Sequence, residues 1–448
     1  MSDAQMSEVV KKLDKTALVF DVSGIVLSPS EPDMSNSTKI ENARMQAGQV
    51  FTPGSPVNER DLFSGRIDQF STVIDAVTQR GYHAVMFGER GVGKTSLANI
   101  ISTGLQGSGS WLVPRVTCDA ADTFSTLWRK AFRDVIMTRK QPGLGFAADD
   151  TTEHESLVNS LPEDLTPDHV RRVLSDLARG TTLLVVFDEF DRIRDVETTL
   201  LIADTIKALS DYAVAATILL IGVADSVGEL IAGHASIERA LVQIPMPRMS
   251  KKEITQIVTK GAERLEVSFT REAIDEISSL SQGLPYITHL LSLHSVRAAL
   301  SRDSVTVSEA DVLGGMNKAL EQWQQSIKTA YYEATRSQQP GNIFKEVLLA
   351  CALADVDELG YFTAAAVRQP LRIITNRNYD IPNFARHLKE LSEAGRGELL
   401  QRVGETRRLR YRFTSPIMRP YIVIRGVAEG LIDRPRLRKI EGAQSLGG

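Results

Sequence analysis

The chain has 448 residues, more than one hydrophobic core usually spans, so we expect two to four domains. Its apolar content of 42% and charged content of 24% are ordinary for a globular protein, and its net charge of −4 argues against a protein that coats nucleic acid. The only two cysteines, Cys118 and Cys351, are far apart, which excludes a disulfide framework and favours a reducing cytoplasm. No apolar run reaches the roughly 18 residues of a membrane span, and the first residues lack the apolar core of a signal peptide, so we expect a cytoplasmic protein.

Residues 1–50 are mostly polar and predict an N-terminal arm that is partly disordered. One apolar patch, residues 17–20, favours a single strand that docks on a neighbour, while disorder throughout is the other interpretation. Residues 28–32 and 35–38 are rich in serine, proline and asparagine, a composition typical of linkers.

From residue 51 the pattern changes to one typical of an α/β fold. Apolar runs that read as buried strands alternate with helical patterns, and they occupy residues 84–87, 112–116, 183–187 and 217–223. This alternation predicts a core with a mostly parallel sheet over residues 51–247. Residues 141–165 interrupt the pattern with glycine, proline and acidic residues, and predict a surface insertion.

The sequence GERGVGKT at residues 88–95 matches G-x-x-x-x-G-K-[ST], the phosphate-binding P-loop. A strand pattern precedes it and a helical pattern follows, which is the context that the motif requires. The residues predicted to contact the nucleotide are Gly88, Glu89, Arg90, Gly91, Val92, Gly93, Lys94, Thr95 and Ser96. Lys94 is expected to reach the β and γ phosphates, and the Thr95 hydroxyl to ligate Mg²⁺.

A second motif ends the apolar run at residues 183–187 with two carboxylates, Asp188 and Glu189. Open α/β sheets place their ligands at the carboxyl ends of their strands. We therefore expect Asp188 to hold Mg²⁺ and Glu189 to orient and polarise the attacking water. Asp191, which follows closely, reads as the cap of a helix that starts near Arg192.

Beyond the core, residues 248–325 predict a helical lid, with helices expected over 270–280, 285–301 and 308–322. Residues 326–430 predict helix, short strand, two helices and a hairpin, the order of a winged helix; these elements are expected at 343–354, 361–362, 363–374, 383–394, 398–403 and 408–414. Residues 431–448 read as a basic, flexible tail.

The C-terminal region is strongly basic. Residues 396–439 contain twelve basic and four acidic side chains, a net charge of +8 in a chain of net charge −4, which is typical of a protein that binds phosphate backbones. The candidate DNA contacts are Arg386, Lys389, Arg408, Arg410 and Arg412. Winged helices also mediate protein contacts, so both uses of this surface stay open.

With these motifs the chain resembles the AAA+ and STAND ATPases, most of all the origin-recognition ATPases, over residues 58–300. Four further segments carry the resemblance: FSGR at 63–66, LLIGVADS at 219–226, IERAL at 237–241 and GLP at 283–285. The resemblance implies that Phe63 and Arg66 lie near the base and ribose and that Asp225 touches the γ-phosphate or the water. It also implies that Arg239 is an arginine finger offered to a neighbouring subunit, and that Pro285 lies near adenine.

The chain departs from the family at one position. Tyr286 stands where origin-recognition proteins carry an arginine near the γ-phosphate, so we expect slow hydrolysis. His289 lies one turn further along the same helix and either replaces that cation in part or is an ordinary helix residue. The leading interpretation is an ATP- and Mg²⁺-dependent switch that self-assembles when ATP is bound and engages a protein effector or DNA. An ATP-dependent DNA loader and a non-hydrolysing ATP-bound scaffold are the alternatives.

Overall fold

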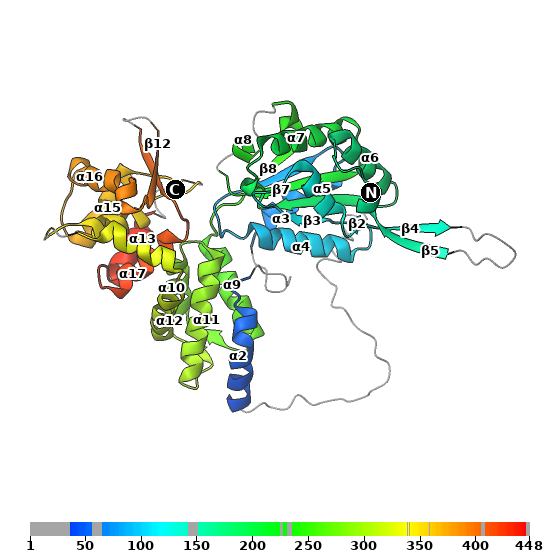
Figure 1. Cartoon of the computed structure of the whole chain (residues 1–448). Coiled ribbons are helices and arrows are strands. Elements are labelled where there is room, and N and C mark those ends of the chain that lie inside the picture. The colour runs from blue at the N-terminus through cyan, green and yellow to red at the C-terminus, as the bar shows by residue number, and fades with distance from the viewer. Residues whose placement is uncertain are drawn as a thin grey trace. The chain divides into compact units, whose positions relative to one another are not determined.

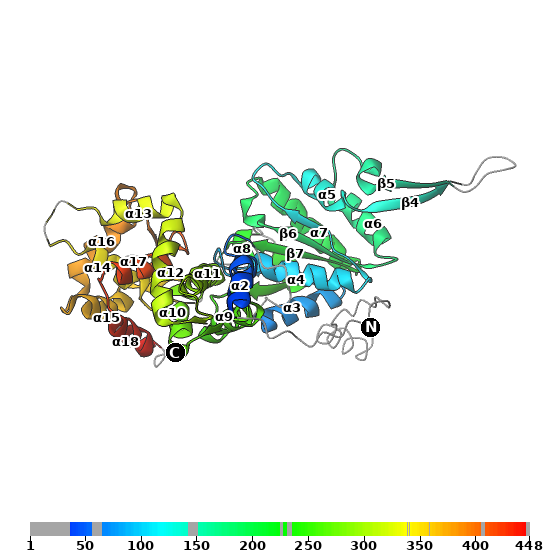
Figure 2. The ribbon, with the colours of Figure 1, turned by 90° about the horizontal axis from the view of Figure 1, so that it is seen from below.

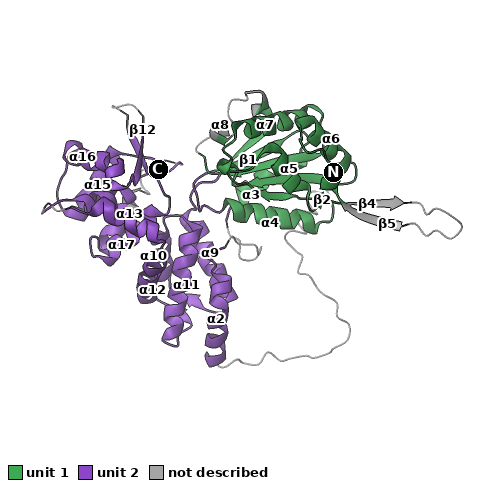
Figure 3. Cartoon of the chain, in the orientation of Figure 1, with its two compact units in different colours: residues 1–35, 67–87, 94–245 green, residues 36–66, 88–93, 246–448 purple. Residues whose placement is uncertain are grey.

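A computed structural model of the chain (Figure 1) describes residues 36–55, 65–141, 151–224, 227–230, 235–337, 339, 341–357, 359–404 and 408–444. These residues form two compact units (Figure 3). Unit 1 holds the described residues of 67–87 and 94–245, and unit 2 holds those of 36–66, 88–93 and 246–444. The finer division into five parts that the sequence suggests stays a prediction.

Unit 1 is built on a six-stranded parallel sheet, in which β6 pairs with both β2 and β3 and the order is β2-β6-β7-β1-β8. Its strands are β1 (His83–Phe87), β2 (Trp111–Leu112), β3 (Arg115–Thr117), β6 (Thr182–Asp188), β7 (Ala216–Gly222) and β8 (Leu241–Pro245). The predicted α/β core is therefore confirmed. The run expected at 112–116 is divided into β2 and β3 around Pro114, which has no N–H to donate to a ladder. β8 was not predicted.

Helices cover both faces of this sheet, which is why β1 and β7 are buried along their whole length. Figures 1 and 2 show α3 and α4 on one face and α5, α6 and α7 on the other. On the second face Trp128 stacks on Phe132 and meets Phe187 of β6 edge to face. The helices are α3 (Ile67–Thr78), α4 (Lys94–Gly107), α5 (Phe124–Phe132), α6 (Pro167–Leu177), α7 (Val196–Asp211) and α8 (Val227–Leu230), with 3₁₀ turns η1 (Leu157–Ser160), η2 (Phe190–Arg192) and η3 (Ala235–Ala240).

The predicted surface insertion begins as an antiparallel hairpin. Strands β4 (Ile136–Gln141) and β5 (Thr151–Ser156) pair from Ile136 and Ser156 outward, and residues 142–150 lie outside the described part. The chain then returns to the core through η1 and α6.

The first part of unit 2 is a helical bundle. It contains α2 (Asn36–Val50), α9 (Lys251–Arg264), α10 (Arg271–Ser281), α11 (Pro285–Ser301) and α12 (Glu309–Gln322), with a short parallel pair β9 (Ser268–Phe269) and β10 (Thr306–Val307). The bounds of α11 are those expected from the sequence. The linker interpretation of residues 35–38 is wrong from Asn36 onward, because α2 begins there and packs Ala43, Ala47 and Val50 against the bundle. Residues 1–35 lie outside the described part.

The second part of unit 2 follows the helix, strand, helix, helix, hairpin order expected from the sequence. It contains α13 (Gln325–Thr335), α14 (Phe344–Ala352), β11 (Phe362–Thr363), α15 (Ala364–Thr375), α16 (Ile381–Leu391), η4 (Ala394–Arg396), β12 (Leu400–Val403), β13 (Arg410–Phe413), α17 (Met418–Ala428) and α18 (Arg434–Gln444). The three strands form an antiparallel sheet in the order β11-β13-β12. Its classification as a winged helix stays a prediction.

The basic C-terminal segment is a helix and not the flexible tail that the sequence suggested. Helix α18 buries Leu437 and Ile440, and Arg434 forms ion pairs with Glu276 and Glu309. Part of the positive charge of this region is thus neutralised inside unit 2. In the part of the chain that the structure describes, no helix is both long and apolar enough to cross a membrane.

Candidate nucleotide site

The P-loop connects β1 directly to α4. Gly88, Gly91 and Gly93 have φ angles of 147°, 87° and 98°, values that side-chain-bearing residues rarely adopt. At Gly88 a Cβ would lie only 2.5 Å from the carbonyl oxygen of Met246, so a larger residue does not fit. The loop leads directly into the N-terminal end of α4, where the helix dipole places a partial positive charge. The loop and helix start therefore fit an anionic phosphate.

Lys94 and Thr95 open α4 at the carboxyl edge of the sheet. Lys94 is buried, and the Thr95 hydroxyl donates to Oδ1 of Asp188 over 3.4 Å. These two oxygens are the hard ligands that Mg²⁺ prefers, and phosphate oxygens would complete the coordination. Among the described residues no cluster of three or more His, Cys, Asp or Glu could hold a metal by itself. The predicted Mg²⁺ ligands, Thr95 and Asp188, are therefore brought together and fit the ion.

Asp188 has a partner that the sequence did not reveal. Arg115 of β3 donates from Nη2 to Oδ2 of Asp188 over 2.8 Å, while the Glu189 N–H donates to Oδ1 over 2.9 Å. The carboxylate is thus oriented with Oδ1 toward Thr95 and Oδ2 toward Arg115. Arg115 belongs to no motif, and only the pairing of β3 with β6 places it here.

Glu189 follows β6 in a left-handed conformation, with φ of 56° and ψ of 37°. Such a backbone costs about 1–3 kcal/mol in a residue that bears a side chain, and it is frequent at functional sites. The Glu189 carboxylate accepts from Nη1 of Arg192 over 2.7 Å. The predicted cap role of Asp191 is wrong, because Asp191 lies inside η2 and accepts from the Val223 N–H at the end of β7 over 2.8 Å.

Strand β7 lies between β1 and β6, so the segment after Gly222 emerges between the P-loop strand and the strand that carries Asp188. This is where a γ-phosphate sensor is expected. Asp225 and Phe63, two of the predicted site residues, lie outside the described part of the chain.

Arg66 supports the P-loop backbone within unit 2. Its buried guanidinium donates to the carbonyl oxygens of Val92, over 3.2 Å, and of Pro247. Its backbone N–H donates to Glu253 over 3.1 Å. Burial lowers the pKa of Arg66, an effect that the nearby Glu253 carboxylate partly offsets. In this arrangement the side chain shapes the loop, and its predicted approach to base and ribose stays a prediction.

Residues of the predicted lid, in unit 2, approach the same loop. Pro285, the first residue of α11, has Cγ 3.8 Å from where a Cβ on Gly93 would lie. His289 accepts from the Thr52 N–H over 3.3 Å and packs edge-on against Phe51. Because burial lowers the pKa of His289 to about 4, its ring is neutral near pH 7. His289 therefore does not supply the cation that is missing at Tyr286.

Glu89, the second residue of the loop, is tied to two other parts of unit 2. It forms a 2.7 Å ion pair with Arg248, and both side chains are only 16% exposed. Arg248 also donates to the carbonyl oxygens of Gln282, over 3.0 Å, and of Pro416, over 3.4 Å. A side chain at Gly360 would overlap the Glu89 carboxylate. Arg248 lies in no motif, and the sequence offered no signal for this link.

Arg239 lies at the opposite edge of the sheet from the P-loop. Its turn, η3, precedes β8, and β8 runs parallel to β1 with Leu241 beside His83. A strand of this length spans about 17 Å, so Arg239 and the carboxyl edge of its own sheet are separated by that length. Its exposed side chain lines a hollow of about 530 Å³.

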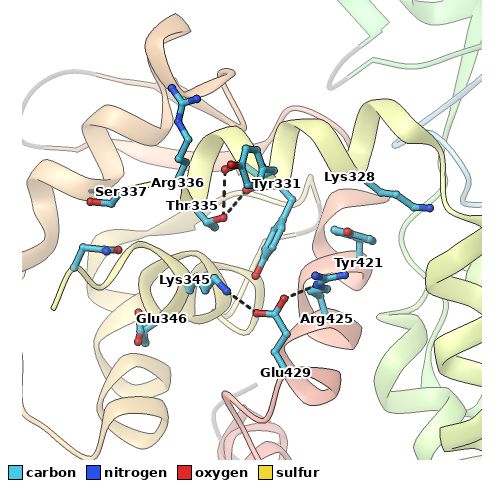
Figure 4. A pocket seen from close by; sticks show the side chains of 12 residues that line it. Lys328, Tyr331, Thr335, Arg336, Ser337, Lys345, Glu346, Tyr421, Arg425 and Glu429 are labelled. Carbon is cyan, nitrogen blue, oxygen red and sulfur yellow. Dashed lines mark hydrogen bonds and ion pairs between the residues drawn. The ribbon is translucent and has the colours of Figure 1, made fainter. Parts of the chain in front are cut away.

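Most of the candidate DNA contacts bind partners within unit 2. Arg386 pairs with Glu390 at 2.6 Å, Lys389 with Glu393 at 3.8 Å and Arg410 with Asp357 at 3.1 Å, while Arg412 donates to Gln401 over 2.8 Å and Arg408 is exposed. Side chains alternate along β13, because Tyr411 and Phe413 are buried while Arg410 and Arg412 are more exposed. Unit 2 also contains a hollow of about 540 Å³ (Figure 4) in which charges are paired. There Glu429 forms ion pairs with both Lys345 and Arg425.

The parallel sheet, the glycine loop and the Thr95–Asp188 contact are those of a P-loop NTPase. The chain belongs to the novel STAND NTPase 1 family, whose model matches residues 56–374. The STAND assignment made from the sequence is thereby confirmed.

Solved structures similar to this chain include members of the origin-recognition group. Cdc6p from Pyrobaculum aerophilum is 14% identical with a TM-score of 0.43, over 86% of this chain and 99% of that one. The Walker-type ATPase of Pyrococcus abyssi is 16% identical with a TM-score of 0.47, over 83% and 99%. The Orc1 protein of Aeropyrum pernix, solved in complex with DNA, is 14% identical with a TM-score of 0.42, over 87% and 97%. A comparison with curated proteins finds no match.

Proposed function

We propose that this protein is an ATP-hydrolysing molecular switch whose nucleotide state controls self-assembly and the engagement of a partner. The observation that carries the proposal is the contact of Glu89 with Arg248. Through it, one residue of the phosphate loop is held to the backbone of the lid, at Gln282, and to that of the C-terminal region, at Pro416. A change in the loop is therefore transmitted to both.

The switch works by competition for Arg248. An ATP triphosphate brings about four negative charges to the loop, which attract the Arg248 guanidinium and repel the Glu89 carboxylate. The hydrogen bonds of Arg248 to Gln282 and Pro416 then change with the nucleotide state. After hydrolysis and release of phosphate this charge falls, and the ion pair between Glu89 and Arg248 is favoured again.

The chemistry of hydrolysis is assigned to residues at the carboxyl edge of the sheet. Lys94 and the loop N–H groups bind the phosphates, and Thr95 and Asp188 would hold Mg²⁺, which neutralises charge on the β and γ phosphates. Glu189 orients the attacking water. The ion pair between Glu189 and Arg192 must loosen before Glu189 can accept a proton. In addition, Tyr286 supplies no cation near the γ-phosphate. For both reasons turnover is slow.

Arg239 acts in this scheme on a neighbouring subunit, because the length of the sheet separates it from its own phosphate loop. A guanidinium fixed by a neighbour can neutralise charge that develops on the γ-phosphate. The ATP-bound form is therefore a homo-oligomer, with a protein effector as the further partner. A cytoplasmic location agrees with the two buried, unpaired cysteines and stays a prediction.

The test is the mass of the protein in solution, measured by light scattering with no nucleotide, with ADP and with a slowly hydrolysed ATP analogue. We expect a higher mass only with the analogue. Arg248→Ala removes the link and leaves Lys94 and the loop N–H groups in place, so the variant should still bind the analogue yet lose the difference between ADP and the analogue. An unchanged mass in wild-type protein that binds the analogue would rule out nucleotide-controlled assembly.

DNA engagement by the C-terminal region is the second candidate function. The alternation of buried Tyr411 and Phe413 with outward Arg410 and Arg412 favours it, as does the exposed Arg408. Binding should tolerate changes of sequence and weaken with salt, with a slope of about −0.9 per phosphate contacted. Arg408→Glu, Arg410→Glu and Arg412→Glu together should remove binding of a duplex and leave ATP affinity intact. If wild-type protein with ATP binds no duplex at low salt, this face docks protein instead.

A third candidate, an ATP-bound scaffold without turnover, predicts equal and negligible hydrolysis by wild-type protein and Glu189→Gln. The backbone strain at Glu189 argues against it, because a scaffold has no use for a carboxylate held there.

A further inference from the structure

The amino edge of the sheet in unit 1 carries a cluster of cations, of which only Arg239 belongs to a motif. The hollow of about 530 Å³ next to Arg239 is also lined by Arg80, Lys207 and Asp211. We call these four residues and the space between them the basic hollow. All four side chains are exposed.

Three separate elements bring the cations together. Arg80 lies in the turn between α3 and β1, Lys207 on α7 and Arg239 in η3. The Ser210 hydroxyl of α7 donates to the Gly81 carbonyl oxygen over 2.8 Å, and Thr217 of β7 donates to that of Tyr82 over 3.1 Å. The walls of the basic hollow are thus held by hydrogen bonds between elements.

The charges in the basic hollow are not balanced. It holds three cations and one carboxylate, and within the described part of the chain none of the three cations forms an ion pair. Other arginines of unit 1 do pair with carboxylates: Arg115 with Asp188, Arg171 with Asp168, Arg179 with Asp176 and Arg192 with Glu189. Like charges placed side by side repel, so this arrangement favours an anion from outside the unit.

We propose that the basic hollow binds the triphosphate of a nucleotide held by a second copy of this chain, with Arg80 and Lys207 acting beside Arg239. The proposal rests on the proposed function and extends it from one trans-acting arginine to a three-cation site. A nucleotide in the same subunit does not fit the role, since its phosphates lie at the carboxyl edge, about 17 Å along the strands. Arg239 and Arg80 offer planar, forked donors and Lys207 a compact point charge, a combination that suits several phosphate oxygens.

The test uses the full chain and two readouts, ATP turnover and assembly driven by a slowly hydrolysed analogue. Arg80→Ala, Lys207→Ala and Arg239→Ala are each mixed with Lys94→Ala protein, which supplies an intact basic hollow but no nucleotide site of its own. We expect the mixing to restore part of the turnover in all three cases. Alone, Arg80→Ala and Lys207→Ala should each turn over about tenfold more slowly than wild type, less than the roughly 10²–10³-fold loss of a donor placed directly on the developing charge.

Assembly is the readout that does not depend on ATP hydrolysis. Each variant should need about tenfold more analogue, or protein, to reach half of the wild-type mass. Arg179→Ala is the matched control, because Arg179 is an exposed arginine of the same unit whose ion-pair partner is Asp176, three residues before it. It should behave as wild type in both readouts.

The outcomes separate this inference from the proposed function. If wild-type protein neither hydrolyses ATP nor assembles with the analogue, the proposed function itself is wrong. If Arg239→Ala loses turnover and assembly while Arg80→Ala and Lys207→Ala match Arg179→Ala, the three-cation site is overturned and the single finger stands. If the Arg80 and Lys207 variants only have a lower melting temperature, these cations stabilise helix ends, and the proposal fails. If the variants only lose the binding of duplex DNA, these cations bind nucleic acid, and the proposal also fails.

Discussion

The two edges of the parallel sheet in unit 1 differ in whether their charged side chains form ion pairs. At the carboxyl edge each functional carboxylate has a cationic partner, Arg115 for Asp188 at 2.8 Å and Arg192 for Glu189 at 2.7 Å. At the amino edge Arg80, Lys207 and Arg239 converge without ion pairs in the described part of the chain. At the carboxyl edge a ligand has to displace the ion-pair partners of Asp188 and Glu189. At the amino edge the three cations can bind an anionic ligand without displacing any carboxylate.

The difference follows from the parallel arrangement. All six strands end at the same edge, so the residues after them gather there and bind each other. At the opposite edge the turns before β1 and β8 lie side by side, and they bring basic residues together from segments far apart in sequence. The predictions below test whether the two edges are distinct sites, from the largest expected effect to the smallest.

Lys94→Ala should abolish nucleotide binding, because it removes the cation that we expect to face the β and γ phosphates at the start of α4. The amino edge should be unaffected, so the variant should still serve as partner in mixing experiments. Titration with a fluorescent ATP analogue measures the effect, with the exposed Lys318→Ala as control. Equal affinities of the two variants would refute the assignment of the carboxyl edge as the phosphate site.

Glu189→Gln should leave nucleotide binding intact and slow hydrolysis by about 10²–10⁴-fold, the usual contribution of a group that activates water. The change keeps the size of the side chain and removes its charge and its ion pair with Arg192. Single-turnover release of phosphate is the measurement. A variant as fast as wild type would mean that the strained backbone at residue 189 serves another purpose.

Arg115→Gln should change how nucleotide binding depends on Mg²⁺. The guanidinium bound to Asp188 opposes a second cation on the same carboxylate, so its removal should lower the half-saturating Mg²⁺ concentration by about three- to tenfold. Analogue affinity measured without Mg²⁺ should stay the same, which a merely structural loss would not allow. Arg192→Gln is the control, because Arg192 binds Glu189 and not Asp188. Identical Mg²⁺ curves for wild type and Arg115→Gln would show that Arg115 only fills space.

Acid should weaken unit 1 through His83, the first residue of β1. His83 accepts from the Ile218 N–H over 2.9 Å, and burial lowers its pKa from 6.5 to about 3. Between these pH values the unfolded chain binds the proton and the folded chain does not, so the stability that His83 contributes is complete above about pH 6.5 and lost as the pH falls toward 3. From pH 7.5 to 5.5 we expect a loss of about 1.4 kcal/mol in the free energy of unfolding that His83→Gln does not show. A wild-type loss that the variant reproduces in full would assign it to other groups.

Short-range signals in the sequence determined much of the fold and of the carboxyl edge. The P-loop, the acidic end of β6 and the bounds of α11 were all predicted correctly, because each depends on residues that are neighbours in the chain. Glycine is needed where φ is positive, proline is suited to the first turn of a helix, and a buried strand needs a continuous apolar run.

Only the tertiary structure decided the rest, because the deciding contacts join distant segments. Asn36–Val50 and Arg434–Gln444 look polar in sequence, and each is a helix since a few apolar side chains meet a partner surface elsewhere in unit 2. Asp191 bonds to Val223 instead of capping a helix, since β7 ends beside it. Arg115, Arg248, Arg80 and Lys207 belong to no motif. Strand pairing and packing bring them to their sites, and a charged side chain carries no local signal of the partner it will meet.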